Sequence, residues 1–257
     1  MENLFSVLRR KLEIIFKEKI NSTNTYGKEN IEILADKSVV YTNFQTQGRG
    51  RMNRKWVSFD SENLYASIIL KPQGDYSKLP ISNLTQLLSA VIVDVLNFYG
   101  IKSNIKWPND IVIMKDENDI FGKKICGILA EAASGGNNIK GIVLGFGLNI
   151  NATKQELSKI DRPATSMLNE TGSIFDVKEV LNNICEMFFL KYDNFMERGF
   201  SSIKLDYLSK IKFLGKEITI NMPHKTVKGK AKDITDNGAV LIEDNKILKE
   251  ITIGEIL

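Results

Sequence analysis

Cysteine and histidine are scarce in this sequence, with two cysteines and one histidine among 257 residues. Cys126 and Cys185 each lie in an apolar stretch, and two thiols do not make a disulfide framework. We therefore expect buried, reduced side chains and a cytoplasmic protein. The single histidine, His224, falls in the C-terminal tail, and we expect it to lie at the surface.

Several sequence signatures of other protein classes are also absent. Neither G-x-G-x-x-G nor G-x-x-x-x-G-K-[ST] occurs, which argues against a dinucleotide fold and against a P-loop. There is no internal repeat, no low-complexity tract and no uninterrupted apolar run long enough to cross a membrane. The net charge of +4 is too small to require a nucleic acid or a membrane surface as a partner. With 43% hydrophobic and 26% charged residues, the composition is that of a soluble globular protein with a sizeable core.

Charged residues occur throughout the N-terminal segment, which excludes a signal peptide and a membrane span there. Apolar side chains recur within this segment at helical spacing, at Leu4, Leu8, Leu12, Ile15 and Phe16. The spacing predicts an amphipathic helix on the surface. A basic helix bound to a membrane is the alternative, but the acidic residues Glu2, Glu13 and Glu18 argue against it.

The middle of the chain predicts an α+β fold, in which a mixed β-sheet carries helices. Runs rich in β-forming residues predict strands at 38–45, 63–71, 103–107 and 111–114, and a hairpin of 125–133 with 139–151. Apolar periodicity predicts helices at 80–100, 177–197 and 203–211.

The pattern of residues changes near residue 214. From there on, short β-rich runs alternate with turns such as Asn237-Gly238 and Asp244-Asn245. We expect a main domain of residues 1–212 and a small C-terminal β-barrel of residues 213–257. So short a segment is near the lower limit for independent stability, and we expect it to dock on the main domain.

Positive charge is concentrated in residues 45–58, QTQGRGRMNRKWVS, which contain no anchor for a core before the tryptophan. Gly48 and Gly50 let backbone N–H groups approach a ligand closely, while Arg49 and Arg51 supply guanidinium groups. Such a loop can wrap an anion. The alternative is a solvated hairpin tip whose charges only confer solubility. Nucleic acid is a third candidate ligand, but phosphate tracking favours charge spread over a face together with stacking aromatic residues.

Three further motifs place polar residues at strand ends. KWPND puts Asn109 and Asp110 beside a proline-stiffened strand break, where they either ligate Mg²⁺ or form an ordinary turn. GKKICGILAEA begins with Lys123 and Lys124, which either extend to solvent or neutralise a carboxylate or phosphoryl oxygen over a partly dry pocket. In GFGLNIN the strand glycines permit close backbone approach, and Asn149 offers an amide near a metal.

In chain order, the motifs STN, QTQGRGRMNRKW, NLYASIIL, KWPND, GKKICGILAE and GFGLNIN resemble those of the biotin protein ligases over residues 21–151. The β-rich tail resembles the small SH3-type barrel of that family. The resemblance implies a biotin/lipoate ligase-like, class II synthetase-like mixed sheet with helices, followed by the barrel. Lipoate ligases and octanoyltransferases share the fold but generally lack the doubled Gly-Arg loop, so the chain is more similar to the biotin ligases.

The resemblance implies the activity of a biotin–[acetyl-CoA-carboxylase] ligase. Biotin and ATP, with Mg²⁺, give biotinyl-5′-AMP and pyrophosphate, and a lysine of a biotin carboxyl carrier domain then takes the biotinyl group. Because the carboxylate and the triphosphate repel each other, positive charge has to gather both. The basic segment then has a physical role in the reaction.

The same resemblance implies roles for individual residues of the main domain, which would be catalytic and bind biotin and ATP. Arg51 and Lys124 are implied to be catalytic. The residues implied to bind biotin are Ser22, Thr23, Asn24, Gln45, Gly48, Arg49, Gly50, Arg51 and Lys124. The residues implied to bind ATP are Arg51, Trp56, Asn109, Asp110 and Asn149, of which Asp110, Asn109 and Asn149 are also implied to hold the metal.

The sequence departs from the family pattern in two places. Asn53 stands where the basic loop usually has a third glycine, and asparagine tolerates the left-handed conformation better than most residues. The stretch between Asp110 and Lys124 is longer than in some relatives, and we expect KDEND, residues 115–119, to form an extended hairpin tip.

Several expectations concern partners. Only about 20 residues precede STN, too few for the helix-turn-helix domain of family members that repress their own biosynthetic genes, so we predict no specific DNA binding. We also predict no membrane association, and exposed sheet edges are able to support a homodimer. Two alternative functions stay open: a lipoate-type protein ligase on the same fold, and a non-catalytic module that binds a small ligand or nucleic acid.

Overall fold

The computed structural model describes residues 12–52, 54–74, 76, 79–116, 119, 121–135 and 138–257. Its largest feature is a seven-stranded sheet in the order β1-β2-β3-β7-β6-β5-β4. The strands are β1 (Ile14–Phe16), β2 (Val39–Thr42), β3 (Leu64–Leu70), β4 (Asn104–Lys106), β5 (Asp110–Ile113), β6 (Lys123–Gly135) and β7 (Asn138–Leu148). β1 runs parallel to β2, whereas the other neighbouring pairs are antiparallel, so the predicted mixed sheet is confirmed.

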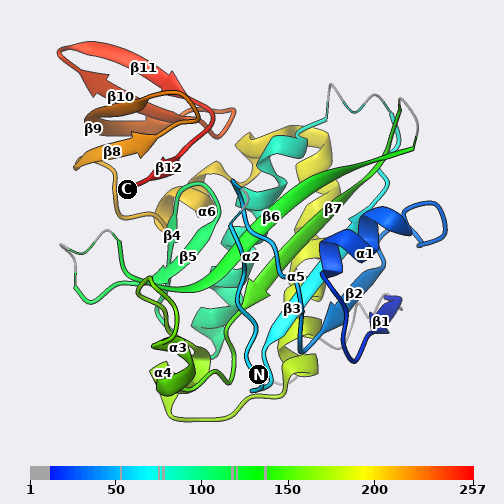
Figure 1. Cartoon of the computed structure of the whole chain (residues 1–257). Coiled ribbons are helices and arrows are strands. Elements are labelled where there is room, and N and C mark those ends of the chain that lie inside the picture. Colours follow the sequence, from blue (N-terminus) through cyan, green and yellow to red (C-terminus); the bar gives the residue numbers. More distant parts are fainter. Residues whose placement is uncertain are drawn as a thin grey trace.

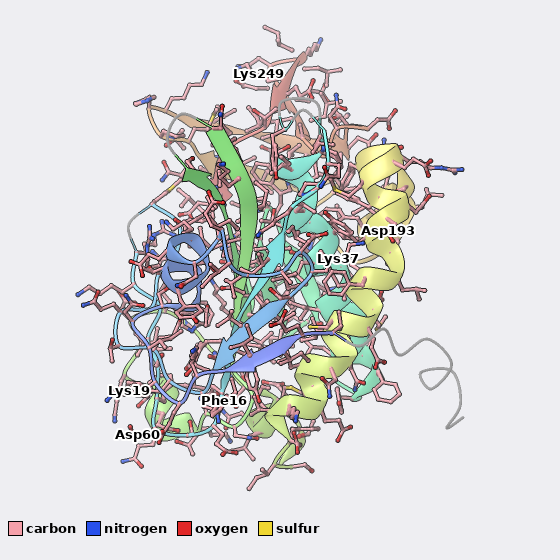
Figure 2. The ribbon with its side chains drawn as sticks, turned by 90° about the vertical axis from the view of Figure 1, so that its right-hand side faces the viewer. Phe16, Lys19, Lys37, Asp60, Asp193 and Lys249 are labelled. Atoms are coloured by element: carbon pink, nitrogen blue, oxygen red, sulfur yellow. The ribbon has the colours of Figure 1, made fainter. Side chains whose placement is uncertain are left out.

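Helices cover both faces of this sheet (Figure 1). The helix α1 (Thr23–Glu29) contacts β3, β6 and β7 on one face, and α2 (Leu84–Phe98) and α5 (Val177–Arg198) pack together on the other. Figure 2 shows the molecule from the side, with α1 and α5 on opposite sides of the strands. The short helices are α3 (Lys154–Leu157), α4 (Met167–Thr171) and α6 (Lys204–Ser209).

The helix α2 lies at the centre of the core, as its apolar periodicity predicts. Its inward side chains are almost fully buried: Leu84, Leu87, Leu88, Val91, Val95 and Leu96. Gly100 follows the helix with a φ of 79°, the left-handed conformation that commonly ends helices. Residues 81–98 are long and apolar enough to cross a membrane, with a mean hydropathy of 1.4, but 61% of this stretch is buried inside the molecule. The stretch is therefore the core helix that packs on the sheet.

The C-terminal segment forms a separate antiparallel sheet in the order β11-β10-β9-β8-β12. Its strands are β8 (Glu217–Asn221), β9 (Thr226–Ile234), β10 (Val240–Asp244), β11 (Ile247–Ile251) and β12 (Glu255–Ile256). The predicted turn at Gly238 docks on the large sheet and its helix, because its carbonyl accepts hydrogen bonds from Gln86 Nε2 (2.9 Å) and Trp107 Nε1 (3.3 Å). This five-stranded sheet is consistent with the expected SH3-type barrel.

The predicted N-terminal helix is wrong where the structure describes it. Residues 14–16 form the edge strand β1, flanked by hydrogen bonds from Val39 N to Glu13 O and from Lys17 N to Tyr41 O, each 2.9 Å long. Two adjacent isoleucines favour a strand, and pairing with β2 outweighs the helical spacing of the apolar residues. The part of the pattern that includes Leu4 and Leu8 lies outside the described residues.

The helix α1 is not predicted by the sequence pattern, because its threonines, asparagine and glycine have low helix propensity. Packing on the sheet stabilises it instead. A Cβ at Gly27 would come 2.9 Å from Ile69 Cδ1, so only glycine lets the helix approach so closely. This close approach places the buried side chains of Thr23 and Asn24 at the surface of the sheet.

The expected hairpin tip at residues 115–119 is only partly described, since Glu117 and Asn118 lie outside the described residues. Asp119 closes the connection by accepting hydrogen bonds from Lys115 N (3.0 Å) and Gly122 N (2.8 Å). The cysteines and the histidine lie as expected, with both thiols free and buried and the histidine exposed.

Candidate active site

Three glycines leave bare backbone on one face of the large sheet: Gly127 on β6, and Gly145 and Gly147 on β7. We call them the glycine floor. A Cβ at Gly127 or Gly147 would come 2.7 or 2.6 Å from the Trp56 ring, and one at Gly145 would overlap the Asn24 amide. The missing side chains therefore let an indole and an amide lie directly on the sheet.

A buried polar cluster surrounds Asn24 at one end of the glycine floor. The Asn24 amide oxygen accepts a hydrogen bond from Ser67 Oγ at 2.7 Å. Its amide nitrogen donates to Leu129 O at 3.1 Å and to Glu131 Oε2 at 2.9 Å. Each of these hydrogen bonds joins Asn24 of α1 to a strand, β3 or β6. The fold therefore fixes the orientation of the Asn24 side chain.

The other polar residues predicted to bind biotin lie next to this cluster. Thr23 donates from its backbone N (2.8 Å) and from Oγ1 (3.3 Å) to Gln45 Oε1. Ser22 begins α1 as its N-cap, with its hydroxyl facing Thr25 N. All three predicted side chains, Ser22, Thr23 and Gln45, are buried. The structure thus brings the STN motif and the start of the basic segment together.

Glu131 on β6 is an acidic member of the cluster to which the sequence motifs assigned no role. Its carboxylate forms ion pairs with Lys28 Nζ (2.7 Å) and Arg49 Nη2 (3.1 Å). Burial by itself raises the pKa of Glu131, but hydrogen bonds from Lys28 and Asn24 and the charges of Lys28 and Arg49 lower it below its ordinary value. The carboxylate is therefore ionised and connects α1 with the basic loop.

The basic loop spans residues 48–54, and its described residues, 48–52 and 54, form a tight hairpin. Trp56 N donates to Gly48 O (2.9 Å), and Gly50 N donates to Arg54 O (2.8 Å). A Cβ at Gly48 would come 2.5 Å from the backbone oxygen of Trp56, so the hairpin needs glycine there. Asn53, the departure from the family pattern, lies outside the described residues.

Arg51 reaches from this hairpin to two other parts of the chain. Its Nη1 donates to Asn109 Oδ1 at 2.7 Å, and its Nη2 donates to Gly254 O at 3.2 Å. Burial lowers the pKa of Arg51, and the charges of Asp110 and Glu255 act in the opposite direction. A guanidinium group that is partly removed from water is thereby held beside the KWPND motif.

Lys124 faces the same region from β6. Its Nζ forms an ion pair with Asp110 (2.7 Å) and lies 5.2 Å from the centre of the Trp56 ring. Within the described part of the chain, Trp56 Nε1 and Tyr65 OH are buried without a hydrogen-bond partner. Burial raises the pKa of Tyr65 to about 12, which keeps the hydroxyl protonated as a donor. The Trp56 and Tyr65 side chains therefore face each other at this end of the glycine floor.

The two asparagines predicted to serve ATP are buried near this group. Asn109 Nδ2 donates to Ile128 O at 2.7 Å, and Asn149 Nδ2 donates to Thr165 O at 3.0 Å. The segment of Thr165 pairs in turn with the start of β6, since Thr165 N donates to Lys124 O at 2.9 Å. The structure therefore places both asparagines beside the strand of Lys124.

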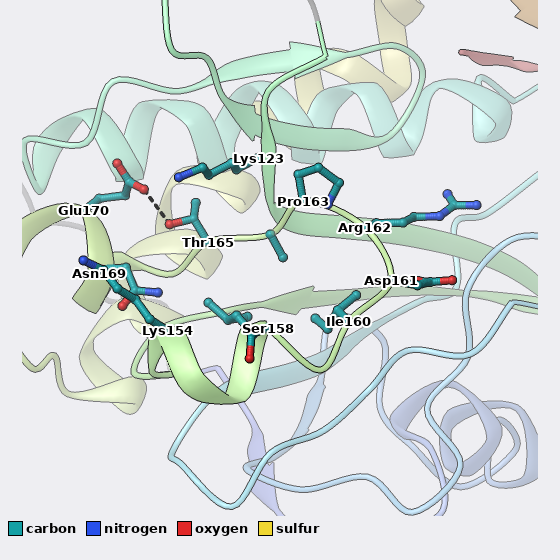
Figure 3. A pocket seen from close by; sticks show the side chains of 12 residues that line it. Lys123, Lys154, Ser158, Ile160, Asp161, Arg162, Pro163, Thr165, Asn169 and Glu170 are labelled. Atoms are coloured by element: carbon teal, nitrogen blue, oxygen red, sulfur yellow. Dashed lines mark hydrogen bonds between the residues drawn. The ribbon is translucent and has the colours of Figure 1, made fainter.

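A cavity of about 640 Å³ opens on the far side of this segment, between α3, α4 and residues 158–165 (Figure 3). Its charged lining includes Lys123, Lys154 and Arg162. None of the predicted site residues lines it. It borders the site only through Thr165, which also accepts the hydrogen bond from Asn149. Lys123 and Lys124 therefore have different surroundings, although they are neighbours in sequence.

The site also contains residues that the sequence motifs do not predict. They are Lys28, Ser67, Tyr65 and Glu131 in the main sheet and helix, and Gly254 and Glu255 in the C-terminal sheet. Glu131 ends the quoted GKKICGILAE motif, and its place on an otherwise apolar strand is the only signal for it. Nothing in the tail sequence points to Glu255.

Residues 16–149 match the Biotin/lipoate A/B protein ligase family, and residues 213–257 match the Biotin protein ligase C terminal domain. The chain is 32% identical to the Bifunctional ligase/repressor BirA of Bacillus subtilis, over 95% of this chain and 73% of that protein. It is 26% identical to the Biotin--[acetyl-CoA-carboxylase] ligase of Paracoccus denitrificans, over 87% and 91% of the two chains.

Solved structures agree with these matches. The biotin protein ligase from Aquifex aeolicus in complex with biotin and ATP superimposes with a TM-score of 0.80 and 27% identity, covering 95% of this chain and 97% of that one. The fold and the family resemblance drawn from the motifs are confirmed, and the chain belongs to the biotin/lipoate A/B protein ligase family.

Proposed function

We propose that the chain is an ATP-dependent biotin protein ligase, a biotin–[acetyl-CoA-carboxylase] ligase. The observation that carries the proposal is the convergence of Arg51, Lys124 and Asp110 around Trp56 on the glycine floor, next to the buried Asn24 cluster. Arg51 and Lys124 lie at one end of the floor. At the other end, neutral hydrogen-bonding groups of the Asn24 cluster surround the ion-paired Glu131. A ligand with a polar ring and a carboxylate tail fits this arrangement.

The first step joins biotin to the nucleotide. A carboxylate oxygen of biotin attacks the α-phosphorus of ATP, the bond to the β-phosphate oxygen breaks, and pyrophosphate leaves. Two anions have to meet in this step, so Arg51 and Lys124 stabilise the charge that develops on the phosphoryl oxygens. Closing the basic loop, with Gly48, Arg49 and Gly50, over the adenylate keeps water from hydrolysing it.

The second step transfers the biotinyl group. The neutral ε-amine of an acceptor lysine attacks the carbonyl carbon of biotinyl-5′-AMP, the bond to the phosphate oxygen breaks, and AMP leaves as the amine loses a proton. The acceptor is the biotin carboxyl carrier domain of a biotin-dependent carboxylase, as the names of the relatives suggest.

Biotin is favoured over lipoate by the chemistry of the Asn24 cluster. Ser22, Thr23, Asn24 and Gln45 supply several buried donors and acceptors at the Asn24 end of the floor. A ureido ring has two N–H donors and a carbonyl, and pairs with such a set. A dithiolane ring has none of these groups and forms no such hydrogen bonds.

Magnesium fits this site as a companion of the nucleotide. The described residues contain no group of three or more His, Cys, Asp or Glu side chains that could hold a metal ion. Asp110 is one carboxylate, and Asn109 and Asn149 add amide oxygens, which suits an ion that brings phosphate ligands with it. We propose that these three residues, with Arg51 and Trp56, serve MgATP.

Further assignments belong to the same proposal. Residues 1–212 form the catalytic domain and residues 213–257 the small barrel, and the protein works in the cytoplasm. A homodimer through exposed sheet edges, and the absence of specific DNA binding, stay predictions.

The test is incubation of the protein with MgATP, an acceptor domain, and either biotin or lipoate, followed by intact-mass analysis. We expect the acceptor to gain one biotinyl group and no lipoyl group. Lipoyl addition would identify the alternative ligase. Absence of biotin-dependent pyrophosphate release would instead support a non-catalytic binding module.

A further inference from the structure

The two outer arginines of the described basic loop are each held by a carboxylate. Arg49 Nη2 lies 3.1 Å from Glu131 Oε1. Arg54 forms a bidentate pair with Glu255, with N–O distances of 2.6 and 2.5 Å. The hydrogen bond from Arg54 lowers the pKa of Glu255, so this pair is ionised.

Arg51, between them, is held differently. In the described structure it donates to two neutral oxygens, the side chain of Asn109 and the backbone carbonyl of Gly254. No carboxylate takes part in these contacts. Its positive charge is therefore not neutralised by a direct partner, although the group is partly buried. Such a guanidinium group has the strongest tendency of the three to take up an anionic ligand.

The two carboxylates belong to different parts of the molecule. Glu131 lies on β6 in the middle of the large sheet and is also bound by Lys28 and Asn24. Glu255 lies on β12 of the C-terminal sheet, next to Gly254, whose φ is 150° and where a Cβ would lie 2.5 Å from Ile220 Cγ2. The loop is thus attached at one end to the main domain and at the other to the small sheet.

We propose that Glu131 and Glu255 are positioning residues that fasten the two ends of the basic loop and present Arg51 to the phosphoryl oxygens between them. Glu131 holds one end of the loop beside the Asn24 cluster, and this contact therefore affects biotin binding. Glu255 holds the other end beside Asn109 and Asp110, and this contact therefore affects nucleotide binding. This division of labour rests on the proposed ligase function.

The kinetic test compares Glu131→Gln and Glu255→Gln, which keep the side-chain shape and remove the charge. Glu131→Gln raises KM for biotin about tenfold and leaves KM for MgATP within twofold of wild type, whereas Glu255→Gln does the reverse. The matched controls are Glu32→Gln and Glu243→Gln, whose carboxylates pair with Lys140 and Lys232 away from the loop. Both controls keep wild-type constants.

Limited trypsin digestion of the unliganded protein provides a readout that does not depend on activity, because the loop contains three arginines. Both Gln variants are cut in the loop several times faster than wild type and the controls. Equal effects of the two variants on both KM values, or unchanged cleavage rates, overturn the proposal. If wild type forms no biotinyl product, the ligase function fails, while faster cleavage in the variants still supports the two attachments.

Discussion

Lys124 makes an ion pair with Asp110 and lies against the Trp56 ring, so its charge is fixed near the floor rather than extended into solvent. Its neighbour Lys123 is exposed and lines a separate cavity. From the sequence, either lysine could extend into solvent or neutralise a carboxylate or phosphoryl oxygen. A register shift between β5 and β6 decides between them, because it interrupts the simple alternation of β6 and leaves Lys124 on the face of Gly127.

Replacing Lys124 by alanine should lower biotin-dependent pyrophosphate–ATP exchange by about 100-fold or more, since one charged group is lost from a site where anions meet. The matched control is Lys123→Ala, which should keep the wild-type rate. Thermal unfolding of both variants checks that the fold is intact. Normal exchange in Lys124→Ala would show that its assigned role is wrong.

Acid should weaken the contribution of Glu131 to stability. The folded-state pKa of Glu131 lies below its ordinary value of 4.5, so its stabilisation is fully present above that value and is lost as pH falls through the folded-state pKa. Urea unfolding at pH 7 should show Glu131→Gln to be about 1–3 kcal/mol less stable than wild type. The difference should narrow below pH 4.5. A difference that stays constant with pH would contradict this account.

At the scale of elements, the strands and long helices follow from the sequence, because β-rich runs and the spacing in α2 reflect burial directly. The edge strand β1 and the helix α1 do not. The local pattern around β1 indicates a helix, and pairing with β2 makes it a strand instead. The local pattern of α1 indicates a loop, and packing of Gly27 against Ile69 makes it a helix. The glycine floor could be predicted as a place of close approach, but not its two occupants, Trp56 and Asn24.

Adding one methyl group to the floor should disturb one occupant selectively. Gly147→Ala would push the Trp56 ring from its present position, because a Cβ there lies 2.6 Å from the indole. We expect KM for biotin or MgATP to rise about tenfold or more, while the urea-unfolding midpoint changes little if the ring relocates. The midpoint and both KM values together check this. Unchanged constants would mean that the floor is not part of the site.

At the scale of the whole molecule, the small sheet contacts the rest of the chain at several places, two of which are described above. The Gly238 turn docks on α2 and Trp107, and Gly254 and Glu255 reach the basic loop. The tail sequence predicts a barrel and its docking, but the pairing of Arg54 with Glu255 joins residues 201 positions apart. No local pattern encodes such a pair, so this part of the site could not be predicted.

The docking contact should matter for stability more than for chemistry. Gln86 is buried, donates to Gly238 O and accepts from Asn83. Gln86→Leu should therefore reduce the free energy of unfolding by about 1 kcal/mol, because the Gly238 carbonyl loses one of its two donors and Asn83 loses an acceptor. Urea unfolding followed by tryptophan fluorescence measures this. Wild-type stability would show that the hydrogen bond from Gln86 contributes nothing to docking.

The most direct test is a crystal structure of the protein with biotin and MgATP. We predict biotinyl-5′-AMP on the glycine floor, with the ureido ring at the Asn24 cluster. The guanidinium group of Arg51 and the ammonium group of Lys124 should lie within hydrogen-bonding distance of the phosphoryl oxygens. A structure with both substrates bound, in which residues 48–54 point into solvent far from the nucleotide, would contradict the account.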